Sequence, residues 1–287
     1  MDRILIFLLD SSNAILVLML VSLGLAVIFG LMNVINMAHG EFLVLGAYGV
    51  LTLQWAGLPF AACLVIAPVL VALIGLAAEE LLIRRTYERL LDTILATWGL
   101  SLVLRQGLVL IYGPGSHAVA APDMGSVPVF GEIYPVYRLV VMALSAAAIA
   151  FTFWVFFRTA LGLQARAVIA NRNMAACLGI NTRMLDRLTF AFGAGLAGLA
   201  GAVMSPLISV DPNAGLGWLV PGFLSILVAG LGSLSGPIVG AAGVGAVDSL
   251  AAAISSPVWA QLTVFVAAII VIRFFPQGLM ALKRREA

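Results

Sequence analysis

Long apolar runs without a charged side chain take up most of this sequence, and they constrain its fold more than any other feature. Three of them cover residues 11–40, 42–78 and 212–247. Crossing the hydrocarbon core of a bilayer takes about 20 mainly apolar residues. Only 10% of the residues are charged and 63% are hydrophobic, a balance that no soluble domain of this length would show. We therefore expect an all-α integral membrane protein.

The apolar runs predict a polytopic helical bundle of eight or nine transmembrane spans, some of them discontinuous. The run at 212–247 contains Pro221 and Pro237, so it fits two short spans, or one span and a re-entrant piece, better than two plain helices. We expect the whole chain, 1–287, to form one transmembrane domain. The predicted spans lie within 11–40, in two parts of 42–78 separated near Gly57-Leu58-Pro59, at about 93–112, 139–157 and 188–208, within 212–247, and at about 257–275.

Basic residues predict the sidedness of these spans, because short basic loops stay on the cytosolic side of a membrane. Eleven of the fifteen lysines and arginines lie in three segments, at 84–89, 158–187 and 283–285. We expect these segments and the C-terminus in the cytosol and, with nine spans, the N-terminus outside. The loop at 113–137 has acids and no basic residue, so it is predicted to face outward.

The segment 158–187 is the longest polar interruption of the sequence, with five arginines and one acid, Asp186. Asn171 can cap a short helix there, and Gly179 can end it. About two helical turns are too few to be stable alone in water. Since Met174, Ala175 and Leu178 are expected to share one face, we predict that this helix docks into another protein.

A cluster of polar residues interrupts the first apolar run. Asn33, Asn36, His39 and Glu41 lie close together where a helix would otherwise pass through lipid. Polar groups at that depth are costly and face protein or a water-filled cavity. One interpretation is a helix broken near Gly40 whose freed backbone lines a translocation path. The other is a plain cytosolic turn with solvated His39 and Glu41.

A second interruption, Gly230–Gly240, contains the other candidate path residues, which are Gly232, Ser233 and Gly236. Broken hydrophobic segments in both halves of a chain indicate the transport site in repeat-built transporters.

Three further charged positions lie within or at the end of predicted spans. We expect Arg105 to reach the outer interface by extending its side chain, or else to pair with an acid such as Asp248. Glu79 and Glu80 are expected to form an interfacial charge cluster with Arg84.

Several chemistries are disfavoured. Lys283 is the only lysine and lies in the C-terminal tail, so the chain has no Walker A lysine and is not expected to bind ATP by a P-loop. Two histidines and two distant cysteines give no metal-ligand spacing, and no nucleophile elbow is present. We therefore predict no catalytic residue, no metal and no cofactor.

Four stretches resemble the permease subunits of bacterial ABC importers for branched-chain amino acids, in particular the high-affinity H type. The permeases for urea and short amides are a close sister group. The resemblance covers nearly the whole chain, in the same order, and rests on GLMNVINMAHGEFLVLGAYG (30–49), ALGLQARAVIANRNMAACLGI (160–180), FAFGAGLAGLAGA (190–202) and GLGSLSGPIVGA (230–241).

This resemblance implies a permease domain in the bacterial inner membrane that takes up branched-chain amino acids, or else urea or short amides. Its implied partners are a second homologous permease, two cytosolic ATPase subunits that use the ATP, a periplasmic binding protein and membrane lipid, with no nucleic acid. A channel or secondary carrier that works alone is the alternative from another class. The resemblance also places the ATPase coupling motif at Arg172, Met174, Ala175, Ala176, Leu178 and Gly179.

Overall fold

The computed structural model describes residues 2–87, 89–129, 132–230, 235–275 and 278. Eleven α-helices and one short hairpin account for most of them, so the described chain is nearly all helical. The elements are α1 (Asp2–Met32), α2 (His39–Trp55), α3 (Phe60–Leu81), the 3-10 turn η1 (Ile83–Arg85), α4 (Leu90–Tyr112), β1 (Ser126–Val129), β2 (Glu132–Pro135), α5 (Val136–Arg158), α6 (Ala160–Ala170), α7 (Arg172–Cys177), α8 (Thr182–Met204), α9 (Ala214–Ala229), α10 (Gly236–Ile254) and α11 (Pro257–Phe274).

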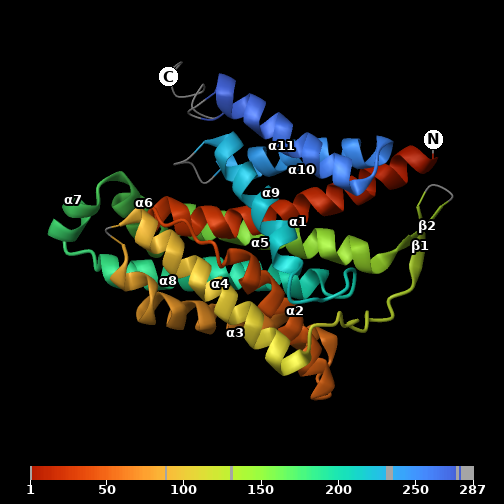
Figure 1. Ribbon diagram of the computed structural model, residues 1–287, viewed down its shortest axis with the longest axis horizontal. Coiled ribbons are helices and arrows are strands. Elements are labelled where there is room, and N and C mark those ends of the chain that lie inside the picture. Colours follow the sequence, from red (N-terminus) through yellow and green to blue (C-terminus); the bar gives the residue numbers. More distant parts are fainter. Residues whose placement is uncertain (1, 88, 130–131, 231–234, 276–277, 279–287) are drawn as a thin grey trace.

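The long helices α1, α5 and α8 run along the long axis of the molecule (Figure 1). At one end lie α6 and α7 with their arginines, and we call this the arginine-rich end. At the other end lies the antiparallel pair β1–β2, and we call this the hairpin end. The Tyr134 hydroxyl of β2 donates a hydrogen bond to Asp10 of α1 at 3.0 Å, which ties the hairpin to the start of α1.

Six helical stretches of the described chain are long and apolar enough to cross a membrane. They are Ile4–Met32, Phe60–Arg85, Leu91–Tyr112, Val136–Arg158, Thr182–Met204 and Gly236–Ile254. The predicted class, a polytopic helical membrane protein, is confirmed, but the count of eight or nine spans is not. Helices α2 and α9 have only 17 and 16 residues, and both lie between the longer helices.

Helix α2 begins in the middle of the bundle. The His39 ring nitrogen Nε2 lies 3.1 Å from the carbonyl oxygen of Val21, which precedes the end of α1 by eleven residues. At 1.5 Å per residue, residues 33–38 therefore bring the chain back by about 16 Å along α1. From there α2 runs to the hairpin end, where the Gln54 amide donates to the Ala120 carbonyl.

Helix α9 begins at the same place and runs the opposite way. Gly40 and Gly215, in the first turns of α2 and α9, are in contact: a Cβ added to Gly40 would lie 2.4 Å from the Gly215 carbonyl oxygen. The far end of α9, at Gly230, borders a cavity together with Arg166 of α6 at the arginine-rich end. The bundle centre thus contains two short helices that meet at their N-termini.

These two short helices belong to two similar four-helix units, α1–α4 and α8–α11. Each unit has a long helix, a short connection, a short helix that starts at the bundle centre, and two more helices. Helix α3 packs on α8 as α10 packs on α1, and α2 packs on α8 as α9 packs on α1. Because α2 and α9 run in opposite directions, the arrangement is that of an inverted repeat.

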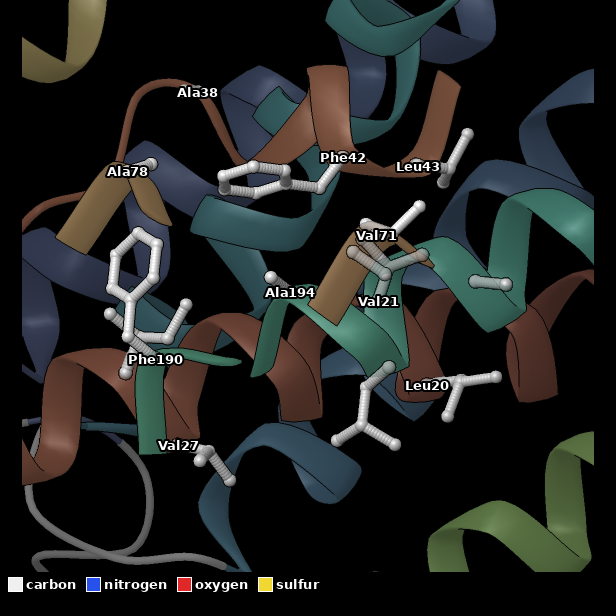
Figure 2. Packing of buried hydrophobic residues seen from close by; sticks show 14 of the residues in the cluster. Leu20, Val21, Val27, Ala38, Phe42, Leu43, Val71, Ala78, Phe190 and Ala194 are labelled. Atoms are coloured by element: carbon white, nitrogen blue, oxygen red, sulfur yellow. The ribbon is translucent and has the colours of Figure 1, made fainter. Parts of the chain in front are cut away.

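The hydrophobic core lies where α1, α2, α3 and α8 meet (Figure 2). Phe42 of α2 and Phe190 of α8 are fully buried, with ring centroids 5.9 Å apart and planes at 84°. Backbones approach closely around them: a Cβ added to Gly201 would lie 1.8 Å from the Leu43 carbonyl oxygen. In lipid no hydrophobic force drives helices together, so such close packing has to hold them.

Candidate functional site

The short helix α7 is capped at both ends as the sequence predicts. The Asn171 side chain accepts a hydrogen bond from the Met174 amide at 3.0 Å. Gly179 has φ +84°, and the amides of Gly179 and Ile180 donate to the carbonyls of Ala176 and Ala175. This is a Schellman motif, in which a left-handed glycine satisfies the last carbonyls of a helix.

Fewer apolar side chains are exposed on α7 than expected. Met174 and Leu178 are well exposed, and Ala176 is exposed as well. Ala175, however, is buried against the rest of the chain, so the prediction that it shares the exposed face with Met174 and Leu178 is wrong. The three-residue spacing to Leu178 spans nearly a full turn, and the direction of Ala175 is set by packing on the bundle.

An ion pair connects α7 to α8. The Arg172 guanidinium, in the first turn of α7, contacts the Asp186 carboxylate of α8. The next residue of α8, Arg187, contacts Glu80 at the end of α3, and its Nε lies 3.9 Å from Glu79. Adjacent residues of α8 therefore join it to α7 on one side and to α3 on the other.

The predicted charge cluster of Glu79, Glu80 and Arg84 is present, since Arg84 contacts Glu80. Glu79 differs from the prediction because it is completely buried. Its carboxylate accepts a hydrogen bond from the Tyr87 hydroxyl. Burial, and then the hydrogen bond to Glu79, raises the pKa of Tyr87 well above its usual range, so this hydroxyl keeps its proton and remains a donor.

At the bundle centre, His39 and Glu41 point to different helices, His39 to α1 and Glu41 to α4. His39 is fully buried, and its Nε2 donates to the Val21 carbonyl of α1. The break in the helix falls at residues 33–38, just before the predicted position at Gly40. The interpretation with a solvated turn is wrong, because both side chains are buried.

Glu41 pairs with Arg105 of α4. The Arg105 Nη2 lies 2.5 Å from Glu41 Oε1, and the Ser101 hydroxyl donates to the same oxygen at 3.0 Å. The first expectation, that Arg105 extends to the outer interface, is therefore wrong, whereas the alternative of pairing with an acid is confirmed, with Glu41 as the acid in place of Asp248. A guanidinium in a membrane helix is stabilised most by a buried carboxylate within reach.

The connection between α1 and α2 is also held by hydrogen bonds. Asn36 is fully buried, and its Oδ1 accepts from the Ala38 amide at 3.1 Å. Thr97 of α4 accepts from the Met37 amide at 3.1 Å. Asn33 is exposed and has φ +53°, a conformation that asparagine tolerates better than most residues.

Of the second group of predicted path residues, Gly232 and Ser233 lie outside the described residues, and Gly236 is buried at the start of α10. A cavity of about 630 Å³ lies nearby at the arginine-rich end, bordered by α1, α5, α6, α9 and α10. Phe29, Phe157, Arg166, Ile226 and Pro237 are among its lining residues. The structure thus brings Asn36, His39, Gly40 and Glu41 together at the bundle centre.

Comparison with known proteins identifies the family. A family model described as "Branched-chain amino acid transport system / permease component" matches residues 7–273. The chain belongs to this family. It is therefore a multi-pass membrane protein and a permease component of a transport system, and the family's members are transport components rather than enzymes.

Curated relatives agree with this family. The chain is 28% identical to the high-affinity branched-chain amino acid transport system permease protein LivH of Salmonella typhimurium, over 91% of this chain and 90% of that protein. It is 27% identical to the corresponding protein BraD of Pseudomonas aeruginosa, over 91% of this chain and 90% of BraD. The autoinducer 2 import system permease protein LsrC of Salmonella paratyphi B is 29% identical over 59% of this chain and 50% of LsrC.

Sequence reasoning did not predict the ion pairs Arg105–Glu41 and Arg172–Asp186, nor the contact between α2 and α9. Two patterns could have predicted the pairs. Asp186 is the only acid among the five arginines of 158–187, and Arg105 and Glu41 are the charges that interrupt their apolar stretches. Charges within a bundle pair with one another. No local pattern predicts that Gly40 meets Gly215.

Proposed function

We propose that this chain is the membrane permease of an ATP-driven importer that takes branched-chain amino acids across the bacterial inner membrane. A periplasmic binding protein would deliver the substrate, a second homologous permease would complete the pore, and two cytosolic ATPase subunits would bind and hydrolyse ATP. The chain itself would use no cofactor. The family and the relatives LivH and BraD support this proposal.

The exposed apolar surface of α7 is the single observation that carries the ATPase part of this proposal. Leu178 is 75% exposed, and Met174 is exposed beside it. A helix of six residues flanked by arginines is too short and too polar at its ends to lie in the lipid core. An apolar surface at the arginine-rich end is therefore best explained as the docking surface for the ATPase. Ala175, Ala176 and Gly179 hold this surface in shape, and Arg172 joins α7 to α8.

We place the translocation path beside the bundle centre, where α2 and α9 begin. Asn36, His39, Gly40 and Glu41 are engaged in contacts within the chain. Their role in the proposal is to hold the first turns of the two short helices in position for a path shared with the second permease. Asn33 and Gly236 would border the cytosolic end of this path, and Gly232 and Ser233 stay candidate path residues on the sequence alone.

The test is uptake by the complete importer in proteoliposomes. Isotope-labelled leucine, urea and a short amide are each supplied with the cognate binding protein, with ATP on the side that carries α7. We expect ATP-dependent uptake of leucine. ATP-dependent uptake of urea or the amide in its place would assign the chain to the sister group.

Two matched variants test the docking surface. Leu178→Asp is expected to lose the ATPase on purification and to lose uptake. Ile133→Asp, at a residue that is equally exposed (75%) but lies in the hairpin, is expected to keep the ATPase. Normal ATPase binding by Leu178→Asp would reject the coupling role of α7. Leucine uptake by the purified chain alone, without ATPase, would identify a stand-alone channel or carrier.

A further inference from the structure

Helix α7 has few contacts of its own with the membrane bundle. It has six residues, and the single side chain that it buries, among the residues described, is that of Ala175. A helix this short does not hold its position by itself. If a partner protein displaces α7, a contact other than the packing of Ala175 has to transmit that displacement to the bundle.

The pair Arg172–Asp186 is placed to do so. Asp186 is 2% exposed in its side chain, whereas Arg172 is 42% exposed. A buried carboxylate without its cation is strongly unfavourable, so Asp186 holds Arg172 firmly. Helix stability does not explain this arginine, because the first turn of a helix favours acidic side chains and not basic ones.

Helix α8 continues the connection. Arg187 contacts Glu80, which also contacts Arg84, so the start of α8 is joined to the end of α3. Farther along, α8 packs closely on its neighbours: a Cβ added to Gly198 would lie 2.7 Å from the Val71 side chain of α3. Closely packed interiors have low compressibility and transmit strain, so a displacement of α8 is passed on to α3.

We propose that Arg172 and Asp186 are positioning residues that transmit displacement of α7 to α8, and through Arg187 and Glu80 to α3. Helix α8 also packs on α1 and α2, so this connection extends to the bundle centre. The inference rests on the proposed function, since it takes α7 as the helix that the ATPase moves.

The experiment measures leucine transported per ATP hydrolysed by the complete importer in proteoliposomes. Asp186→Asn keeps the size of the side chain and removes its charge, and Arg172→Gln removes the other partner. Both are expected to assemble with the ATPase and to hydrolyse ATP, but to transport about tenfold less leucine per ATP, within the range typical of coupling between sites. Arg172→Lys keeps the charge and is expected to restore most of the ratio.

Arg183→Gln is the matched control. Arg183 is an exposed arginine in the first turn of α8, and no ion pair is found for it among the described residues. It is expected to keep the ratio of the unchanged protein. A purely structural role of Asp186 would lower the amount of assembled importer without changing the ratio.

An unchanged ratio in Arg172→Gln or Asp186→Asn, with the ATPase bound, would overturn the inference. If Asp186→Asn does not accumulate in the membrane, the test rests on the Arg172 variants, because Arg172 is only half-buried. The ratio of leucine transported to ATP hydrolysed is then compared between Arg172→Gln and Arg172→Lys. Failure of the proposed function gives a different result: the unchanged importer would then show no ATP-dependent uptake, or Leu178→Asp would transport normally.

Discussion

The ion pair between Glu41 and Arg105 provides a quantitative test of the bundle centre. Glu41 is 2% exposed and Arg105 is 20% exposed in their side chains. Arg105→Ala would leave a buried carboxylate with Ser101 as its remaining donor. Removing one partner of a buried pair typically costs about 3–5 kcal/mol, and we expect the lower value of about 3 kcal/mol because Arg105 is partly exposed. This amounts to roughly a hundredfold change in the folding equilibrium.

Removing both charges should be much less harmful. In Glu41→Gln/Arg105→Gln neither side chain is charged, so no isolated charge is left in the bundle. We expect this double variant to lie within about 1 kcal/mol of the unchanged protein, because replacing a whole buried pair by neutral groups is often close to neutral. The two substitutions thus separate the cost of an unpaired charge from the net value of the pair.

The assay is thermal unfolding of the protein in lipid nanodiscs, followed by tryptophan fluorescence. Arg105→Ala is expected to lower the midpoint by roughly 6–12 °C, at about 2–4 °C per kcal/mol. Arg138→Ala is the control, since Arg138 pairs with Asp10 at the hairpin end and both side chains are about 40% exposed. A pair that exposed is worth about 1 kcal/mol or less. Equal shifts for Arg105→Ala and Arg138→Ala, or a double variant as unstable as the single one, would refute the reasoning.

Two further predictions concern packing and the buried carboxylate at the arginine-rich end. Gly201→Ala is expected to prevent correct assembly in the membrane, because its Cβ would collide with the Leu43 carbonyl. Gly107→Ala is the control, because a Cβ added there would have no heavy atom within 4 Å. Equal yields of folded protein for the two variants would contradict the prediction. Tyr87→Phe is expected to destabilise the protein by about 1–3 kcal/mol, because it removes a hydrogen bond to the buried Glu79. An unchanged unfolding midpoint for Tyr87→Phe would show that Glu79 finds another donor.

The class of the protein and the shape of α7 could be predicted from the sequence because both depend on neighbouring residues. A run without charged side chains is apolar wherever it folds. Asn171 and Gly179 lie directly at the two ends of α7, so the hydrogen bonds that cap this helix are local. The presence of a helix break was also predictable, since polar residues interrupt an apolar run there, and the structure places the break at residues 33–38.

The number of spans and the direction of Ala175 could not be predicted in the same way. Hydropathy indicates that a segment is apolar, but it does not give the depth at which its helix begins. Helices α2 and α9 start at the bundle centre, and that depth depends on the contact between Gly40 and Gly215, residues from different halves of the chain. Ala175 faces inward because of how α7 rests on the bundle.

The sequence by itself thus determined that this chain is a helical membrane protein and how α7 is capped. Only the tertiary structure decided that Glu41 pairs with Arg105 and Arg172 with Asp186. The first pair is separated by 64 residues, and the second by 14 residues and the connection between α7 and α8. Partners of this kind are chosen by which helices pack together, because a buried charge takes the opposite charge that packing brings within reach.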